Sequence, residues 1–196
     1  MVEGEDEIYN AKVIFMGDPE VGKTSIIRTF MEGKPTLKTE RTNMVSDFCR
    51  IIEVNVDGRR YRIKLNIWDA AGDGDVHNLA HLFLRDVQVA ILVYGINSQK
   101  SFNDLDQWLT HLYESNEEGS FSLFLVGNKS DLSKQRAVPK IFGERKQQEI
   151  RECAMFKETS AYNDVGSILS LFDEIGKAII RKNHVSRNSN SQQLRR

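Results

Sequence analysis

The stretch Gly17-Asp18-Pro19-Glu20-Val21-Gly22-Lys23-Thr24 decides the fold of this chain. It follows the apolar run 13–16 and precedes residues 25–30, which fit the beginning of a helix. A buried strand, a glycine-bounded loop, Gly-Lys-Thr and a helix are the context of a phosphate-binding P-loop. In such a loop backbone N–H groups cradle an anion, and the helix points its positive end at the same place. The alternative is a chance Gly-Lys turn, which the preceding strand makes the poorer interpretation.

The P-loop pattern predicts a role for each of its residues. Lys23 is expected to place a full charge on the β and γ phosphates, and the Thr24 hydroxyl to bind Mg²⁺. The other phosphate contacts are expected from the backbone around them. The predicted nucleotide-binding residues of this loop are Pro19, Glu20, Val21, Gly22, Lys23, Thr24 and Ser25.

Composition restricts the class of protein. The 196 residues most simply form one domain, and a net charge of −1 gives no global field for nucleic acid. No apolar run approaches the roughly 20 residues that cross a bilayer. The acidic start 1–7 does not resemble a secretory or mitochondrial signal. Two cysteines, Cys49 and Cys153, lack metal spacing and predict free thiols in the reducing cytoplasm.

Hydrophobic patterning predicts alternating strands and helices, which is typical of an α/β fold. Asp57-Gly58 predicts a hairpin turn, and the strict alternation over 60–68 predicts that one face of this hairpin is wet. Ser101 is the expected N-cap of a helix whose apolar face continues to residue 112. The expected strands are 11–16, 48–56, 60–68, 87–94, 121–126 and 155–159. Helices are expected at 25–31, shortly before 84, and at 101–112, 140–153 and 168–179.

The two terminal segments lie outside the pattern of alternating strands and helices. Residues 1–10 are expected to form a loose acidic lead-in, and the polar, basic residues 183–196 a disordered tail. The domain itself is predicted to span 11–182. Ligands of such sheets bind at the carboxyl ends of the strands, which is where the remaining candidate motifs lie.

Asp69 and Gly72 follow a predicted strand. A carboxylate at Asp69 can hold a phosphate-bound Mg²⁺, directly or through water, and the N–H of Gly72 can meet the terminal phosphate. Asp-x-x-Gly by itself is most often an ordinary turn. Its place one hairpin after a P-loop favours the phosphate interpretation.

The loop Asn128-Lys129-Ser130-Asp131 predicts recognition of guanine. A carboxylate accepts two hydrogen bonds side by side, and guanine, unlike adenine, offers two adjacent donors. Asp131 is therefore the residue expected to recognise the base. Asn128 is expected to bond an acceptor edge of the base and to brace the loop, and the Lys129 stem can cover the base plane. A helix N-cap is the alternative explanation of Asn and Asp here. Further on, Ser160-Ala161 would direct the Ala161 N–H at the guanine carbonyl.

These four motifs, in this order, resemble those of Ras-superfamily small GTPases. Residues 64–69 and 101–108 are similar to segments of Rab proteins, and the resemblance covers about 10–182. It implies a P-loop NTPase three-layer sandwich with about five helices. It also implies a six-stranded, mostly parallel sheet, order 2-3-1-4-5-6, with one antiparallel edge strand. The implied activity is a GTP/GDP switch with Mg²⁺, in vesicle trafficking or signalling.

Several positions depart from the family pattern. The glutamine that orients the attacking water falls on Asp73, which is shorter and anionic, so we predict slow GTP hydrolysis with Lys23, Gly72 and Asp73 as the catalytic set. Pro19 lacks an N–H. Glu20 brings negative charge near the phosphates unless it points to solvent. The alternative to a slow enzyme is a GTP- or GDP-binding scaffold without turnover. A P-loop nucleotide kinase or ATPase is a third possibility.

The first switch is also altered. Counting from the P-loop lysine places the Mg²⁺-binding threonine at Thr42, and counting back from Asp47-Phe48 gives Asn43; we take Thr42. The aromatic residue that covers the base is replaced by Pro35, and Tyr162 is the candidate to cover it instead. These changes predict either faster nucleotide exchange or a first switch that GTP orders poorly.

The resemblance also implies protein partners. Phe48, Trp68 and Phe83 occupy the places of the aromatic residues with which Rab-like surfaces bind effectors, although ordinary core packing explains them equally well. Exchange and activating factors cannot be named from the sequence. The tail has no cysteine for prenylation, so the chain as given is expected to be soluble.

Overall fold

The computed structural model describes residues 8–36, 46–70 and 83–193, with side chains as far as residue 185. Its strands are β1 (Ile8–Met16), β2 (Ser46–Val56), β3 (Arg59–Asp69), β4 (Val89–Gly95), β5 (Ser122–Asn128) and β6 (Cys153–Glu158). Its helices are α1 (Lys23–Glu32), α3 (Gln99–Asn103), α4 (Leu105–Ser115), α5 (Lys140–Glu149) and α6 (Val165–Gln193), with a short 3₁₀ helix at Ser130–Gln135.

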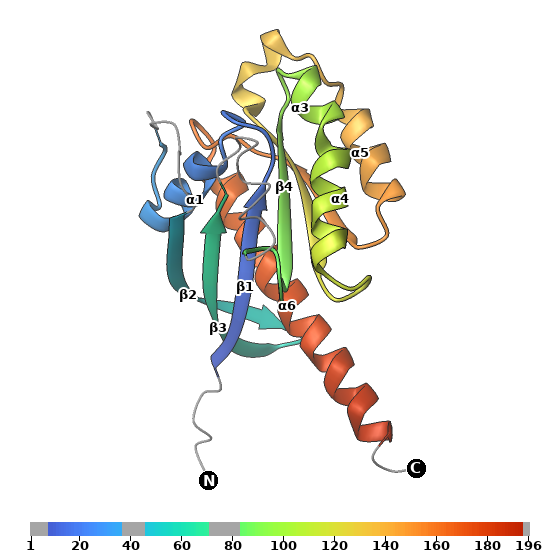
Figure 1. The fold of residues 1–196 in the computed structure, drawn as a ribbon. Coiled ribbons are helices and arrows are strands. Elements are labelled where there is room, and N and C mark those ends of the chain that lie inside the picture. Colours follow the sequence, from blue (N-terminus) through green and yellow to red (C-terminus); the bar gives the residue numbers. More distant parts are fainter. Residues whose placement is uncertain (1–7, 37–45, 71–82, 194–196) are drawn as a thin grey trace.

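The strands form one sheet in the order β2-β3-β1-β4-β5-β6. β2 runs antiparallel to β3, and the other neighbouring pairs are parallel. Figure 1 shows α1 and α6 on one face of the sheet and α3, α4 and α5 on the other. The predicted three-layer α/β architecture and strand order are confirmed.

Two hydrophobic clusters, one on each face, hold the layers together. Successive side chains of a strand point to opposite faces, and both faces of β1 are buried over residues 13–16, so each of these four positions is apolar. Val13 and Phe15 join the cluster beneath α1 and α6, whereas Ile14 and Met16 join the cluster beneath α4. Each such buried side chain contributes about 1.5–3 kcal/mol to folding.

The β2–β3 hairpin closes as the sequence predicts. Asp57 (φ 51°) and Gly58 (φ 77°) both adopt positive φ, which matches the right-handed twist of the strands. In β3 the side chains of Ile63, Leu65 and Ile67 are fully buried. On the other face the residues between them are half-buried, and their partners in β2, Cys49 and Ile51, are exposed, which agrees with the predicted wet face.

α6 packs closely on the sheet and extends beyond it. The ring of Phe172 stacks on Phe30 of α1 with centroids 3.5 Å apart. Gly176 permits α6 to lie close to β2, because a Cβ at this position would lie 2.6 Å from the Val54 side chain. In Figure 1 the last turns of α6 project past the sheet, at the end where β1 begins.

Several predicted boundaries differ from the structure by a few residues, and three of the differences change the interpretation of a segment. β1 begins at Ile8 because residues 8–10 pair with β3, so the lead-in is shorter than predicted. Ser98, not Ser101, caps the first helix of this region, and the Ser98 side chain accepts from the Ser101 N–H. The helix then breaks at Asp104 into α3 and α4.

The third difference concerns the tail. The sequence predicts disorder over 183–196, but α6 continues to Gln193. Composition misleads here because the helix is already nucleated by its packed N-terminal part, and extension adds one hydrogen bond per residue. His184 still contacts the body, with its ring 5.4 Å from that of Tyr61.

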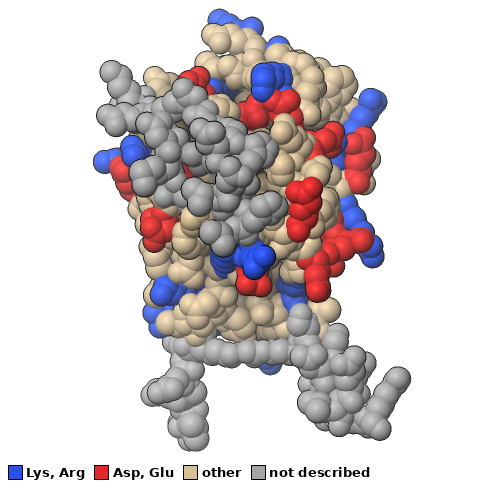
Figure 2. All heavy atoms as spheres, viewed as in Figure 1, with Lys and Arg blue, Asp and Glu red and all other residues tan. Residues whose placement is uncertain are grey.

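Charges of both signs are interspersed over the described surface of the face shown in Figure 2, as the near-zero net charge predicts. Cys49 is exposed and Cys153 half-buried, and both are free thiols, as predicted. Within the described ranges, no helix has the length and hydrophobicity needed to span a membrane.

Candidate nucleotide-binding site

The carboxyl ends of β1, β3, β5 and β6 meet at one edge of the sheet (Figure 1). Each of the four sequence motifs predicted to bind nucleotide begins at or just after one of these strand ends. The described residues at these ends contact one another through the hydrogen bonds given below. The site is therefore built by strand order, which aligns four strand ends that are far apart in the sequence.

The P-loop backbone is shaped by positive φ angles and close packing. Gly17 (φ 136°) presses on β4, since a Cβ there would lie 2.1 Å from the Val93 carbonyl oxygen. Glu20 (φ 63°) and Gly22 (φ 97°) are also left-handed. Gly22 is the N-cap of α1 and supplies no side-chain cap. The first N–H groups of α1 are thus left without side-chain caps at the place where the sequence predicts an anion site.

Lys23 is buried against its own loop. Its Nζ donates to the carbonyl oxygens of Gly17 at 2.7 Å and Asp18 at 2.8 Å. These bonds hold the ammonium group over the loop. Glu20, by contrast, is exposed, so its charge is solvated. The alternative that this glutamate points to solvent is the one the structure supports.

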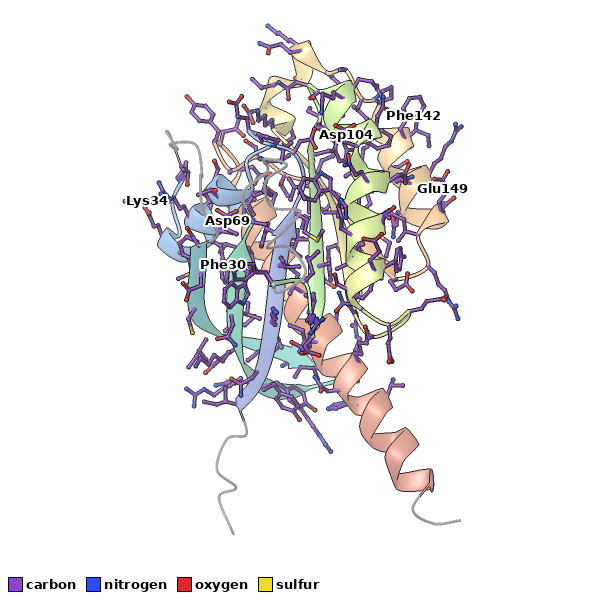
Figure 3. All side chains as sticks on the ribbon, viewed as in Figure 1. Phe30, Lys34, Asp69, Asp104, Phe142 and Glu149 are labelled. Carbon is purple, nitrogen blue, oxygen red and sulfur yellow. The ribbon has the colours of Figure 1, made fainter. Side chains whose placement is uncertain are left out.

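Thr24 and Asp69 meet at the end of β3. The Thr24 hydroxyl donates to Asp69 Oδ2, although the residues are 45 positions apart. Asp69, labelled in Figure 3, is fully buried, and its Oδ1 has no hydrogen-bond partner among the described groups. Burial raises the pKa of this carboxyl, while the Thr24 hydrogen bond and the charge of Lys23 oppose the rise.

This pair fits a magnesium site. Mg²⁺ prefers oxygen ligands and retains several waters, so one hydroxyl, one carboxylate and the phosphates suffice. The unpartnered Oδ1 supplies an acceptor for a metal-bound water. Thr42, the third predicted ligand, lies outside the described residues, as do Gly72 and Asp73.

Asn128 joins the base-recognition loop to the P-loop. It is buried at 2% exposure; its Nδ2 donates to the Val21 carbonyl at 2.9 Å, and its Oδ1 accepts from the Thr159 hydroxyl at 3.2 Å. The predicted brace is therefore present, with its amide orientation consistent with both partners. Lys129 follows with φ 67°, which turns the chain into the 3₁₀ helix.

Asp131 and Ser160 lie together at the base end of the site. The Ser160 hydroxyl donates to Asp131 Oδ1 at 2.6 Å. The same Ser160 oxygen accepts from the N–H groups of Tyr162 at 3.2 Å and Asn163 at 3.1 Å. This network holds the carboxylate and the Ala161 loop in one arrangement. Ala161 is buried, and Tyr162 is 56% exposed.

Two threonines belong to this region that the sequence did not reveal. The Ala161 carbonyl accepts from the Thr36 N–H at 3.0 Å and from the Thr29 hydroxyl at 3.1 Å. Thr36 thereby ties the segment that holds the exposed Pro35 to the Ala161 loop. No local pattern marks these residues, because their partner is more than a hundred positions away.

The aromatic residues predicted to form an effector surface do not share one cluster. Trp68 and Phe83 pack together with ring centroids 5.3 Å apart, on the α4 side of the sheet. Phe48 packs against the cluster beneath α1 and α6. The cause is the β2–β3 register, which pairs Phe48 with Ile67 and so places it on the face opposite Trp68.

The fold and site define the class. A model of the Ras family matches residues 12–181, and the chain belongs to that family. Within it the chain is similar to Rab proteins: it is 30% identical to mouse Rab-17 over 89% of this chain and 78% of the relative. It is 35% identical to RabJ of Dictyostelium discoideum, over 89% of this chain and 65% of that protein. Human Rab-37 is 35% identical, over 76% and 65% respectively. The chain is a Rab-like small GTPase of a family that binds GTP or GDP with Mg²⁺.

Proposed function

We propose that this Rab-like protein is a guanine-nucleotide switch in vesicle trafficking that hydrolyses GTP slowly by itself. The observation that supports it most is the bond from Asn128 to the Val21 carbonyl, which couples the base loop to the P-loop. A nucleotide whose phosphates and base contact these two loops would be held by one connected structure.

The phosphates would lie on the N–H groups of residues 20–25, with Lys23 between the β and γ positions. Bound Mg²⁺ would neutralise charge on the phosphate oxygens. Thr24 would bind it, Asp69 would hold a metal-bound water, and Thr42 would join when GTP is present. The γ-phosphate contacts of Gly72 follow from the family pattern.

The base would be read by Asp131, which Ser160 orients. The Ala161 N–H would meet the guanine carbonyl, and the Lys129 stem would cover one face of the ring. Pro35 and Tyr162 are the apolar groups available for the remaining cover, and both are exposed. Because neither replaces a full aromatic lid from the first switch, we expect nucleotide exchange faster than in the family pattern.

Slow hydrolysis is proposed on account of Asp73. Its carboxylate is too short and too negative to orient a water beside a γ-phosphate. Pro19 removes one N–H group from the phosphate-binding loop. The charge of Glu20 has little effect on the phosphates, because this side chain is exposed to solvent. A scaffold without turnover receives no support from the comparisons with known proteins. Family membership likewise disfavours the nucleotide kinase or ATPase alternative.

Single-turnover hydrolysis tests this function. The nucleotide that copurifies should be GDP or GTP, and loaded GTP should convert slowly to GDP in Mg²⁺. Asp73→Gln should raise the rate at least tenfold, whereas the nearby Asp75→Gln, the matched control, should not. No conversion in either the parent protein or Asp73→Gln would favour the scaffold, and a fast parent protein would refute the role of Asp73.

Partners and location remain predictions. We expect effectors to bind near Trp68 and Phe83, whose rings pack together. Phe48 lies on the other face of the sheet, so we expect it to influence effector binding only indirectly, by holding β2 in position. The two free thiols agree with a cytoplasmic protein. Exchange and activating factors of the family are expected to act on the switch segments.

A further inference from the structure

Asp18, the second residue of the P-loop, has an unusual environment. It is only 8% exposed, and its carboxylate is bonded by side chains from outside the P-loop. Oδ1 accepts from the indole Nε1 of Trp108 at 3.0 Å, and Oδ2 accepts from Lys100 Nζ at 3.2 Å. Lys100 belongs to α3 and Trp108 to α4. The side chain of one loop residue thus joins the P-loop to two helices that follow β4.

The backbone of the same residue contacts the phosphate-binding lysine. The Asp18 carbonyl accepts from Lys23 Nζ at 2.8 Å. Because Pro19 follows, the backbone of Asp18 is also restricted to extended conformations. A movement of the carboxylate would therefore be transmitted through one stiff residue to the carbonyl that orients Lys23.

The helices hold this carboxylate by more than one contact. Lys100 also pairs with Asp104, the residue labelled at the junction of α3 and α4 in Figure 3. Trp108 packs its ring among the hydrophobic residues beneath α4, so the direction of its N–H is set by the core. A hydrogen bond to a charged, buried acceptor is stronger than an ordinary one.

We propose that Trp108 and Lys100 hold the P-loop in its phosphate-binding shape by fixing the Asp18 carboxylate. Both are positioning residues for nucleotide binding, an inference that rests on the proposed nucleotide site. The coupling also works in reverse: nucleotide release changes the surroundings of the Trp108 indole. The α3–α4 surface, where Lys100 is 78% exposed, is thus connected to nucleotide occupancy.

Release of a fluorescent guanine nucleotide, mant-GDP, tests the proposal. Trp108→Phe keeps the ring but loses the N–H, and should speed release about tenfold. Lys100→Met should speed it about two- to threefold, because an exposed pair contributes less. Lys146→Met is the matched control: Lys146 pairs with Asp106 of α4 at 2.5 Å and does not contact the loop, so its release rate should equal that of the parent protein.

Thermal unfolding of each variant separates positioning from simple support. A supporting role would lower the melting temperature and leave the release rate unchanged, and that result for both Trp108→Phe and Lys100→Met would overturn the proposal. If the parent protein does not bind mant-GDP, the proposed function itself fails. If the parent binds it and the variants release it at the parental rate, only the present inference fails.

Intrinsic fluorescence supplies an independent measurement. The chain has two tryptophans, so Trp68→Phe leaves Trp108 as the single emitter. Removal of GDP with EDTA should shift the emission of this variant, and adding Asp18→Leu should abolish the shift. Emission that is unchanged by nucleotide in the Trp68→Phe protein would contradict the coupling.

Discussion

Asn128 lies so close to Gly22 that a Cβ on the glycine would come within 2.3 Å of the Asn128 amide nitrogen. The two residues belong to the base loop and the P-loop, 106 positions apart in the chain (128 − 22). The absence of a side chain at Gly22 is what lets Asn128 reach the Val21 carbonyl. Close contact between these loops makes one site out of two motifs.

Gly22→Ala should therefore abolish tight nucleotide binding. The new methyl group would displace Asn128, and φ 97° adds backbone strain; each effect costs about 1–3 kcal/mol. We expect at least a hundredfold weaker mant-GDP affinity in a fluorescence titration. Gly33→Ala is the matched control, because Gly33 caps the other end of α1 at φ 68° with nothing within 4 Å of its added Cβ. An equal loss of mant-GDP affinity in Gly22→Ala and Gly33→Ala would show that the contact with Asn128 is unimportant.

Asp131→Asn should change which base is bound. The amide replaces a double acceptor with one acceptor and one donor, which suits the extra carbonyl of xanthine and not the amine of guanine. The Ser160 hydroxyl can still bond the asparagine oxygen, so the side chain should keep its position. Competition binding should show GTP weakened about a hundredfold and XTP strengthened. A parallel loss for both nucleotides would mean that Asp131 supports the loop without reading the base.

Arg136→Met should destabilise the fold. Arg136, which ends the 3₁₀ helix Ser130–Gln135, forms a two-pronged ion pair with Glu158 at 2.6 and 2.9 Å, largely shielded from solvent. Removing the arginine leaves a half-buried carboxylate without its partner, which costs about 1–3 kcal/mol. Urea denaturation of the variant and the parent protein measures this loss in the free energy of unfolding. Arg60→Met removes an exposed pair with Glu53 at 3.8 Å and should cost under about 1 kcal/mol; similar costs would contradict the role of burial.

The two thiols should differ in reactivity. Burial raises the pKa of Cys153 to about 11, so at pH 8 almost none of it is thiolate, whereas Cys49 is exposed on the edge strand β2. Iodoacetamide at pH 8 should modify one cysteine in the native protein and both in denaturant, as read by mass spectrometry. Cys49→Ser should leave a native protein that takes up almost no label. Rapid labelling of that variant would refute the burial of Cys153.

The sequence alone determined the parts of this protein that are local. The P-loop, the Asp57-Gly58 turn and the Asn128–Asp131 loop are contiguous, and each follows from the backbone angles or hydrogen bonds that its own residue types allow. The strand pattern identified the α/β class, because a period of two and a continuous apolar run report directly on which faces are buried. The order of the strands needed the family resemblance as well.

The tertiary structure decided everything that depends on residues far apart in the chain. The hydrogen bonds donated by Trp108 to Asp18, by Thr36 to Ala161 and by Ser160 to Asp131 have no local signature. The register of β2 on β3 separated Phe48 from Trp68, and packing on the body carried α6 past the point where composition predicts disorder. Periodicity specifies which face a side chain occupies along its own element, but only the packing of helices on the sheet specifies which side chain of another element it meets.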